Sequence, residues 1–437
     1  MPTLGLYTLG CKVAQYETQA IAERAEARGF TLSSFSAVCD AYVINTCTVT
    51  AESDRKSRQF IRRAIKKNPN AVIAVVGCYS QTSAEEVAAI EGVDIVLGTQ
   101  DKLSVPDRIL ARLQGKERAA TEVSVPSLDG APFEPMCITR APRTRAYVKI
   151  EDGCECRCTY CEIPKARGEV RSKPADEVIA EVLALSRSGT QEVVLTGIET
   201  ASYGIDLTPR VRLIDLLERL DAEPDCPRIR LGSLSPEIMT EDFARRIGAL
   251  SCVVPHFHLS MQSGSDAVLR RMKRRYSRDM ALAAMRRARQ AMPRVQFTTD
   301  LIVGFPAESE ADFADTVALV REGQFLDAHV FAYSPRPGTE AAAFADQIPD
   351  AVKHDRSARL IAEAQRVRDG ILDRLVADGE VLSVIPEVRK GNEYSAHADT
   401  FVEVRVRVSE DTPGLHGSIV SVRPTGHKDG VLYTELA

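Results

Sequence analysis

Short apolar segments alternate with helical patterns along the first 115 residues of the chain. Continuous apolar runs occupy residues 4–9, 41–44, 71–76 and 93–97, and helical patterns lie at 16–28 and 55–67. Strands that are apolar throughout, with helices between them, are typical of a parallel sheet covered on both faces. The pattern therefore predicts an α/β fold class, with a doubly wound parallel domain over residues 1–115.

A second α/β region follows residues 116–139, a stretch broken by proline and glycine that we interpret as a linker. The later apolar runs lie at 147–150, 192–195, 228–231, 256–259, 297–303 and 328–331. Six such strands, alternating with helices, predict a partial β/α barrel rather than a complete eightfold one. We assign residues 140–371 to this domain.

The pattern changes to strict alternation in the last segment, residues 372–437. Valines at 402, 404, 406 and 408 alternate with Glu403, Arg405 and Arg407, which is typical of a half-buried strand. Further short strands are expected at 418–420 and 431–433, and a helix at 356–375 leads into this part. We predict a small all-β barrel of the OB type, a fold that often binds nucleic acid.

Composition narrows the class of protein. The chain has 437 residues, 44% hydrophobic and 27% charged, which is ordinary for globular domains. No apolar stretch is long enough to cross a bilayer, and the N-terminus shows no export signal, so we expect a cytoplasmic protein without a membrane partner. The 11 cysteines should then stay reduced. The net charge of −5 argues against a wholly basic nucleic-acid binder but leaves room for local basic faces.

The most specific chemical signal is the spacing C-x3-C-x2-C formed by Cys154, Cys158 and Cys161. Three thiolates so spaced can hold three corners of a four-iron cluster and leave the fourth iron open for a cofactor or substrate. Structural zinc is the main alternative, but it prefers four closed ligands, usually in two separated pairs. A disulfide framework needs an oxidising compartment. We interpret Cys156, inside the run, as a bystander that points away from the other three.

Three further cysteines each follow a different apolar strand of the first domain. Cys11, Cys47 and Cys78 come directly after the runs at 4–9, 41–44 and 71–76. Because the carboxyl ends of parallel strands share one edge of a sheet, we expect these thiols to meet there as a second three-cysteine site. Buried packing is the alternative for a cysteine, and it is our interpretation of the remaining ones at 39, 137, 226 and 252.

Several polar or glycine-containing segments follow strands of the predicted barrel, whose mouth is where barrel active sites lie. Glycine lets a ligand approach the backbone, a carboxylate can bind an ammonium group, and an apolar wall suits an adenine ring. Steric strand endings are the alternative for each segment alone. The residues that we assign to a cofactor site are Tyr160, Gly197, Glu199, Gln262, Ser263, Ile302 and Gly304.

Two basic runs and one basic strand stand out against the acidic total. They lie in the helix predicted at 55–67, in residues 270–275, and in the alternating strand of the last domain. A solvated surface is the commoner meaning of such a run, and contact with a phosphate backbone is the other. The candidate RNA-binding residues are Arg55, Lys56, Arg62, Arg271, Arg405 and Arg407.

Taken together, these motifs resemble the radical S-adenosylmethionine methylthiotransferases over nearly the whole chain. The resemblance rests on Gly10-Cys11-Lys12, Asn45-Thr46-Cys47-Thr48-Val49-Thr50, Gly77-Cys78-Tyr79, the cysteine run with Ala166-Arg167-Gly168, and Gln262-Ser263-Gly264. The segment from Thr8 to Thr18 is similar to the branch that acts on N6-threonylcarbamoyladenosine in tRNA, although Ala14 stands where that branch usually has asparagine. The tail is similar to that family's RNA-binding TRAM module.

The resemblance implies two 4Fe–4S clusters and S-adenosylmethionine as cofactors. The cluster on Cys154, Cys158 and Cys161 would bind S-adenosylmethionine and generate a 5′-deoxyadenosyl radical, which would abstract hydrogen from carbon 2 of the modified adenosine next to the anticodon. A second cluster, on the three N-terminal cysteines, would deliver sulfur, and a second S-adenosylmethionine the methyl group. The cofactor must carry this step because acid/base chemistry cannot activate an aromatic C–H bond. The implied partners are tRNA and an electron donor such as a flavodoxin or ferredoxin.

Two kinds of alternative remain open from the sequence. The same chemistry could act on isopentenyladenosine in tRNA or on an aspartate of a ribosomal protein. A protein of another class, a metal-stabilised RNA-binding protein without catalysis, would hold zinc or a fully ligated cluster. The cysteine spacing and the barrel-mouth segments favour the enzyme.

Overall fold

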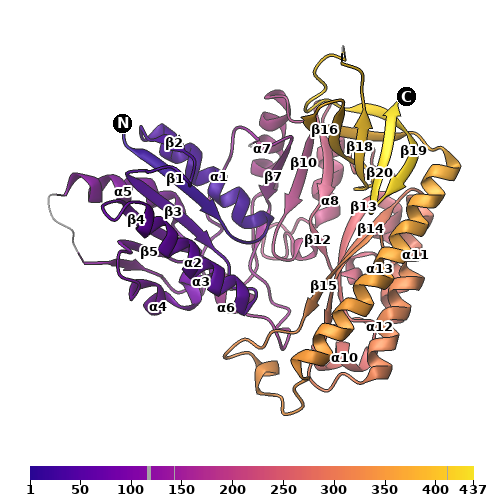
Figure 1. The fold of residues 1–437 in the computed structure, drawn as a ribbon, viewed down its shortest axis with the longest axis horizontal. Helices are drawn as coiled ribbons and strands as arrows, with labels where there is room; N and C mark the ends of the chain where they lie inside the picture. Colours follow the sequence, from indigo (N-terminus) through magenta and orange to yellow (C-terminus); the bar gives the residue numbers. More distant parts are fainter. Residues whose placement is uncertain (116–119, 142, 411) are drawn as a thin grey trace.

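The chain forms an N-terminal α/β domain, a central arc of parallel strands and a C-terminal β-barrel, which Figure 1 shows in order from indigo to yellow. The computed structural model describes residues 1–115, 120–141, 143–410 and 412–437. Among the helices of these residues, none combines the length and the apolar character that a bilayer crossing requires.

The first domain is a parallel sheet in the order β2-β1-β3-β4-β5-β6. One core, which includes Ile21 of α1 and Ile109 of α5, covers one face, and a second core with Ile61 of α2 and Val87 of α4 covers the other. The predicted doubly wound domain is thus confirmed. Its elements are β1 (Thr3–Thr8), α1 (Lys12–Ala27), β2 (Thr31–Ser33), β3 (Ala41–Thr46), α2 (Ala51–Lys67), β4 (Val72–Gly77), α3 (Cys78–Thr82), α4 (Ala84–Ala88), β5 (Ile95–Leu97), α5 (Val105–Gln114) and β6 (Glu122–Ser124).

Two parts of this domain differ from the sequence expectation. The short edge strands β2 and β6 extend the sheet, and β6 lies within residues 116–139, which we expected to be only a linker. Strands of three residues are too short to show a hydrophobic period, so the pattern missed them. The helix α2 begins at Ala51, which places Glu52 and Asp54 in its first turn ahead of the basic run.

The central domain is an open arc of six strand positions. Three strands run in the order β7-β10-β11 and four in the order β12-β13-β14-β15, and Gly232 alone separates β11 from β12. The predicted partial barrel is confirmed. Its strands are β7 (Arg145–Lys149), β10 (Glu192–Thr196), β11 (Arg228–Leu231), β12 (Ser233–Leu234), β13 (His256–Gln262), β14 (Gln296–Val303) and β15 (Asp327–Ala332), and β8 (Glu151–Asp152) and β9 (Arg171–Ser172) form a small hairpin-like pair.

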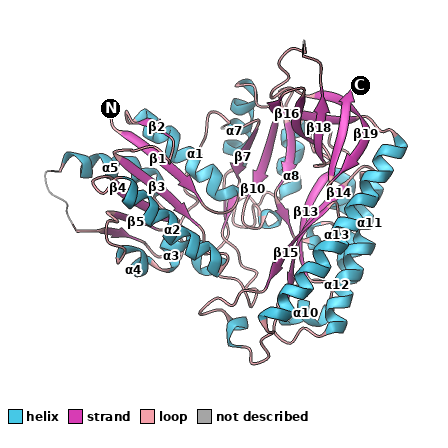
Figure 2. Cartoon of the chain, viewed as in Figure 1, coloured by secondary structure: helices cyan, strands magenta, loops and turns pink. Residues whose placement is uncertain are grey.

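Helices cover the outside of this arc, and Figure 2 shows α11, α12 and α13 alongside one another next to β14 and β15. Apolar faces of the helices and strands form a single large core. The helices are α6 (Ile163–Arg167), α7 (Ala175–Arg187), α8 (Leu213–Asp221), α9 (Glu241–Ile247), α10 (Asp266–Arg271), α11 (Arg278–Ala291) and α12 (Glu310–Gly323).

The C-terminal domain is a closed barrel in the order β16-β17-β18-β20-β19, as the OB-type prediction expected. It follows α13 (Asp350–Asp378), a helix of 29 residues that continues past residue 371, where we placed the domain boundary. The helix continues because Leu372 and Leu375 keep its apolar face buried. The barrel strands are β16 (Leu382–Lys390), β17 (Glu393–Ala398), β18 (Glu403–Arg407), β19 (Val420–Lys428) and β20 (Val431–Leu436).

A buried network of charges joins the first domain to the central arc. Glu17 of α1 forms ion pairs with Lys102 at 2.5 Å, Arg167 at 2.6 Å and Lys149 at 3.2 Å. Asp152 forms ion pairs with Arg167 at 3.0 Å and with Lys149 at 3.1 Å. Burial alone would raise the pKa of Glu17, but the charges of Arg167, Lys102 and Lys149 hold this pKa well below its ordinary value. The network fixes α1 against the arc.

A second polar contact ties the same two domains at another point. Arg336, in the loop after β15, donates to Asp54 at 2.5 Å and to Thr48 at 2.9 Å, and all three side chains are buried. Thr48 is the next residue but one after Thr46, the end of β3. The cysteine-bearing edge of the first sheet is therefore clamped from two sides.

We predict that Glu17→Ala destabilises the protein by about 3–5 kcal/mol, because it leaves three buried cations with one carboxylate fewer between them. Urea unfolding of the apoprotein measures this. The matched change Glu85→Ala, on the exposed face of α4, should alter the free energy of unfolding by no more than about 0.5 kcal/mol. Equal effects of the two substitutions would contradict the structural role given to the network.

Candidate active site

The loop between β8 and α6 carries the three closely spaced cysteines, and its backbone is held in a fixed turn. The Cys154 amide donates to the Gly168 carbonyl at 3.0 Å, and the Cys161 amide donates to the Cys158 carbonyl at 3.1 Å. Gly153 has φ +89°, and a Cβ there would lie 1.9 Å from the Glu169 carbonyl oxygen. Only glycine can start this loop.

Each sulfur of the three cysteines accepts a hydrogen bond. The Cys156 amide donates to Cys154 Sγ, the Ile163 amide to Cys161 Sγ and Arg274 Nη1 to Cys158 Sγ, all at 3.4 Å. Such donors stabilise thiolates and tune the potential of an iron–sulfur cluster. The donor set therefore fits a cluster held by three thiolates, with an arginine close to one corner.

Cys156 does not point away from the other cysteines, contrary to the sequence interpretation. Its amide donates to Cys154 Sγ at 3.4 Å, and the interaction between the two thiols raises the pKa of Cys154 and lowers the pKa of Cys156 to about 6. The positive φ of Arg157, 43°, turns the backbone between Cys156 and Cys158. This local turn, which the spacing does not reveal, brings the fourth sulfur next to the first.

The three N-terminal cysteines lie at the carboxyl edge of the first sheet. Cys11 caps α1 after β1, Cys47 follows β3, and Cys78 begins α3 after β4. A Cβ at Gly10 would lie 3.3 Å from Cys47 Sγ. Burial and the neighbouring Cys78 and Cys11 raise the pKa of Cys47 to about 12, so the three thiols lie within electrostatic reach of one another.

Burial raises the pKa of Cys78, and the neighbouring Arg167 opposes this effect in part. Arg167 Nε donates to Cys78 Sγ at 3.2 Å, and the same arginine belongs to the buried network between the domains. Lys102, Lys149, Arg167 and the more distant Arg171, 3.9 Å from Asp152, outnumber the two carboxylates of that network, and a Cys78 thiolate would reduce the excess positive charge. No three His, Cys, Asp or Glu side chains of the described residues converge on a single metal ion. In a cluster, however, each cysteine binds a different iron atom.

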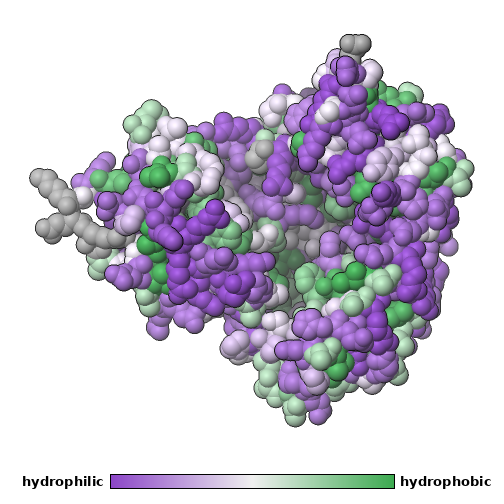
Figure 3. All heavy atoms as spheres, in the orientation of Figure 1, coloured by the Kyte–Doolittle hydropathy of each residue, from purple (hydrophilic) through white to green (hydrophobic). Residues whose placement is uncertain are grey.

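A cavity of about 320 Å³ fills the inside of the arc and opens toward Cys11. Figure 3 shows the molecule hollowed in this region, between the first domain and the arc. The cavity reaches from the amino ends of the strands to their carboxyl ends. It is lined by Cys11, Lys12, Arg145, Tyr147, Val194, Thr196, Gly197, Arg230, Ser233, His256, His258, Thr298, Asp300, His329 and Phe401.

The floor of the cavity comes from the C-terminal barrel. Phe401 lies in the turn between β17 and β18, and its ring stacks on His256 with the ring centres 4.4 Å apart. Arg230 lies 5.2 Å from the same ring and donates to the carbonyls of Asp399 and Ala398. The small barrel thus seals the amino ends of the strands.

A second cavity, of about 190 Å³, lies at the carboxyl end of β14 and β15 and touches the segment after Cys47. It brings together three of the predicted cofactor residues, Tyr160, Gln262 and Ile302, and shares Asp300 with the larger cavity. Gln262 has a φ of +61° at an irregular register of β13, so the backbone is strained where its side chain reaches the cavity. The other lining residues are Val49, Thr50, Phe331, Ala332, Tyr333 and Ser334.

The remaining predicted cofactor residues separate into two groups. Gly197 lines the larger cavity, and Glu199 is buried nearby, where it accepts a hydrogen bond from the Ser235 amide at 3.2 Å. Burial and the negative charge of Cys156 raise the pKa of Glu199 to about 7. Ser263 bonds instead to Thr316, and Gly304 packs on Lys353, so neither lines the two cavities.

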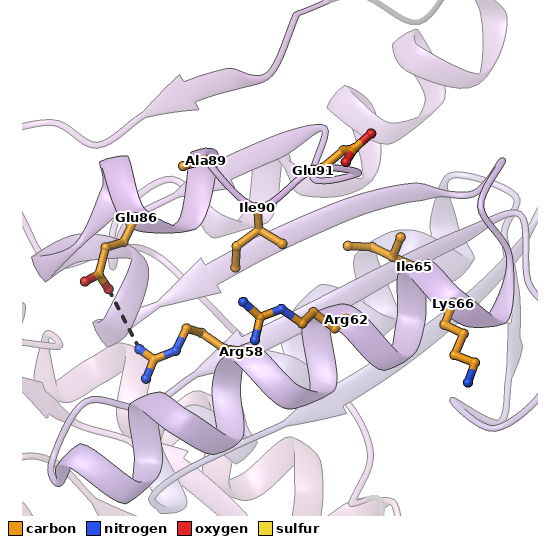
Figure 4. A pocket seen from close by; sticks show the side chains of 8 residues that line it. All are labelled: Arg58, Arg62, Ile65, Lys66, Glu86, Ala89, Ile90 and Glu91. Carbon is orange, nitrogen blue, oxygen red and sulfur yellow. Dashed lines mark ion pairs between the residues drawn. The ribbon is translucent and has the colours of Figure 1, made fainter.

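The basic face of α2 borders a shallow pocket of about 620 Å³ between α2 and the end of α4 (Figure 4). Arg62 points toward Ile90 across this pocket, Lys66 lies at its edge and points away from α4, and Arg58 pairs with Glu86 at 3.8 Å. Arg55 and Lys56 pair with Glu52 in the preceding turn, at 2.6 and 3.9 Å. Of the three predicted RNA contacts on this helix, Arg62 is therefore the one without an ion-pair partner among the described residues.

The other predicted RNA contacts lie far from α2 in the chain. Arg271 is partly buried and donates to the Ala307 carbonyl at 3.0 Å, so it supports the loop after β14. Arg407 is exposed on β18 and borders a pocket of the C-terminal barrel, and Arg405 lies 3.6 Å from Glu403 on the same strand. The structure places these residues on separate surfaces.

Comparison with known proteins identifies the family. Residues 3–98 match the uncharacterized protein family UPF0004, and residues 148–320 match the radical SAM superfamily. The threonylcarbamoyladenosine tRNA methylthiotransferase MtaB of Bacillus subtilis (strain 168) is 39% identical over 440 residues, which cover 97% of this chain and 94% of that relative. This chain belongs to the radical S-adenosylmethionine methylthiotransferase family. It is therefore an enzyme that transfers a sulfur-containing group, and the family implies S-adenosylmethionine and a 4Fe–4S cluster as cofactors.

Other relatives and one solved structure agree with this assignment. The MtaB protein of Thermotoga maritima is 36% identical and covers 90% of this chain and 88% of its own. The tRNA-2-methylthio-N(6)-dimethylallyladenosine synthase of Methylacidiphilum infernorum is 32% identical, over 98% and 94%. The radical S-adenosylmethionine methyltransferase TsrM from Kitasatospora setae superimposes with a TM-score of 0.58 at 16% identity, over 78% and 77% of the two chains, which shows a shared fold.

The structure adds site residues to this methylthiotransferase that the sequence did not single out. Arg274 contacts Cys158, and Arg145, Arg230, His256 and His258 line the cavity. Arg274 stood in a basic run for which we weighed a solvated surface against contact with a phosphate backbone. The other four lie on strands, where a polar side chain every second position was the available signal for an inward-facing polar wall.

We predict that Glu199 makes the apoprotein less stable as the pH rises from about 4.5 to about 7, because its folded pKa of about 7 lies above its unfolded value. Below both values the two states bind the proton equally, and above both the folded state loses up to about 3 kcal/mol. Glu199→Gln should remove this dependence. The difference between wild type and variant in the urea midpoint, measured at pH 5 and pH 8, should therefore grow with pH, and the exposed change Glu177→Gln serves as control. A constant difference would contradict the raised pKa.

Proposed function

We propose that this methylthiotransferase adds a methylthio group to carbon 2 of N6-threonylcarbamoyladenosine next to the anticodon of tRNA. The proposal rests on the full-length similarity to proteins named for that substrate, at 39% and 36% identity. The geometry supports it, because a cavity of about 320 Å³, lined by both polar and apolar side chains, lies directly against Cys11. Phe401 covers the cavity at the amino ends of the strands, so the space beside the proposed sulfur site is bounded at that end.

Cys154, Cys158 and Cys161 are the proposed ligands of the cluster that binds S-adenosylmethionine. When bound, the cluster and S-adenosylmethionine would supply the one-electron chemistry that the side chains of the protein cannot provide. The residues of the chain perform the remaining tasks. The amides of Cys156 and Ile163 and the guanidinium of Arg274 stabilise the thiolates, while Tyr160, Gln262 and Ile302 form the wall next to them.

Cys11, Cys47 and Cys78 are the proposed ligands of a second 4Fe–4S cluster. Arg167 holds Cys78 at 3.2 Å and neutralises part of the negative charge that such a cluster carries. Gly10, with φ +117°, allows Cys11 to turn back over Cys47. The clamps through Glu17 and Arg336 keep this edge of the sheet over the cavity. Exclusion of water and fixed orientation are the catalytic contributions of these contacts.

The competing substrate is isopentenyladenosine, since one relative at 32% identity is named for the dimethylallyl compound. The cavity lining speaks against it. A prenyl group is apolar, and its burial against Lys12, which makes no hydrogen bond or ion pair within the described residues, would leave this ammonium without a direct partner. A threonylcarbamoyl group carries a carboxylate, a hydroxyl and a urea, which match a polar wall.

The partners and compartment of the enzyme follow from the same proposal. The substrate is tRNA, with Arg55, Lys56 and Arg62 of the first domain, Arg271 of the central domain, and Arg405 and Arg407 of the C-terminal barrel as proposed phosphate contacts. The barrel after α13 acts as a TRAM-like RNA-binding module in this proposal. A flavodoxin or ferredoxin supplies electrons, and the reaction takes place in the cytoplasm. The proposed domains are 1–115, a connecting segment at 116–139, 140–371 and 372–437. The structure moves the boundary between the last two from residue 371 to Asp378, the end of α13.

We predict that deletion of the gene abolishes 2-methylthio-N6-threonylcarbamoyladenosine in cellular tRNA, while N6-threonylcarbamoyladenosine accumulates. Mass spectrometry of nucleosides from digested tRNA measures both compounds. Complementation with the wild-type chain should restore the product, and complementation with Cys158→Ala should not. Unchanged threonylcarbamoyl nucleosides, with loss of a methylthiolated isopentenyladenosine or of a modified ribosomal aspartate, would favour an alternative substrate.

We predict that anaerobic reconstitution loads about eight iron atoms per wild-type chain, as two four-iron clusters require, and about four per chain in Cys11→Ala/Cys47→Ala/Cys78→Ala. Iron and sulfide counting with electron paramagnetic resonance of the reduced protein measures this. The matched variant Cys226→Ala, outside both sites, should retain the wild-type count. A triple variant that keeps all its iron would contradict the second cluster.

A further inference from the structure

Lys12 occupies an unusual place in the cavity wall. It is the first residue of α1, directly after Cys11, and it is the one cavity-lining side chain other than Cys11 that the first domain contributes. The strands of the arc and the turn of Phe401 supply all the other lining residues. Lys12 therefore brings a positive charge from outside the arc into its interior, next to the proposed sulfur site.

The charged strand residues that line the cavity already have partners. Arg230 Nε and Nη2 donate to Glu192 at 2.8 and 3.0 Å. Arg145 lies 3.0 Å from Glu387 of the C-terminal barrel. These two guanidinium groups are thus neutralised by carboxylates that stand behind the wall.

Asp300, His256 and His258, which also line the cavity, have partners as well. His258 contacts Thr298 at 2.9 Å through Nδ1 and Asp300 at 3.3 Å through Nε2. His256 contacts Thr298 at 3.0 Å. By contrast, within the residues that the structure describes, Lys12 makes neither a hydrogen bond nor an ion pair. The Lys12 ammonium is only partly exposed, and Asp300, the carboxylate that acts on it across the cavity, forms no direct ion pair with it. An anionic ligand in the cavity would supply a direct partner.

We propose that Lys12 binds the carboxylate of the threonylcarbamoyl group and so selects this nucleoside over uncharged N6-substituted adenosines. The inference rests on the proposed function and names the residue that reads the substrate. Among the groups that distinguish the candidate adenosines, the carboxylate alone is anionic. Ser233, Thr298 and His329, on the same wall, offer donors and acceptors to the hydroxyl and urea groups. Binding to Lys12 also places the N6 substituent on the Cys11 side of the cavity, because the two residues are adjacent.

A different role for Lys12 is to offset the negative charge of a cluster on Cys11. That role would affect every substrate equally, since it does not involve the N6 substituent. The two roles therefore differ in one measurable quantity: the preference of the enzyme for a substrate with a carboxylate over one without it.

The test compares two anticodon stem–loop RNAs that differ in one group. One carries N6-threonylcarbamoyladenosine, and the other carries the same nucleoside with its carboxylate converted to a primary carboxamide. Reconstituted wild type, Lys12→Met and Lys12→Arg are assayed for kcat/KM with each RNA, and iron is counted in each preparation. Competition between the two RNAs for the wild type measures the same preference without any substitution.

The wild type should prefer the carboxylate RNA by about 10- to 100-fold, the range expected for a hydrogen bond to a charged partner. Lys12→Met should lose this preference through a lower kcat/KM for the carboxylate RNA, and Lys12→Arg should keep part of it. An equal rate of the wild type on both RNAs, or an undiminished preference in Lys12→Met, would overturn the inference and leave the proposed function intact. If Lys12→Met does not load iron, the wild-type preference and Lys12→Arg decide. A wild type that modifies neither RNA would overturn the proposed function as well.

Discussion

The buried cluster around Glu17 and Asp152 decides whether the two cysteine centres can work together. Arg167 bonds at once to Glu17 of the first domain, to Asp152 of the arc and to Cys78. Asp152 lies two residues before Cys154. One guanidinium therefore spans the region between the two cysteine loops. Because a buried charge is tolerated only where its partners are in place, the relative position of the two centres is as well defined as the network itself.

The cavity of the arc carries a second consequence of the same physics. Its polar groups face inward from strands whose outer faces are packed in the large apolar core. Most of them are paired with groups behind the wall, which keeps them rigid before a substrate arrives. A preorganised polar wall gives specificity because a ligand that cannot replace the water on it loses binding free energy. The chemistry of the family sets the reaction, and in the proposed function this wall selects the substrate.

The sequence predicted the large features of the fold and part of the site. The parallel sheet, the partial barrel and the terminal barrel followed from hydrophobic periods, and Cys11, Cys47 and Cys78 from their places after strands. It could not reveal the contact between Arg167 and Cys78, 89 residues apart, or the approach of Lys12 to strands of another domain. Neither contact has a local signal. Ser263 and Gly304 show the opposite case, in which motif residues serve the packing of turns.

Phe401 gives the C-terminal barrel a structural role at the cavity of the arc. Its ring closes the amino ends of the strands through His256 and Arg230. A shortened chain that ended after α13 would have an arc open to water at both ends, and a radical formed inside would meet solvent and oxygen. The C-terminal barrel thus also forms one end of the cavity. If the C-terminal barrel were exchanged for that of a relative, we expect activity only where the new β17–β18 turn carries an equally bulky side chain at the position of Phe401.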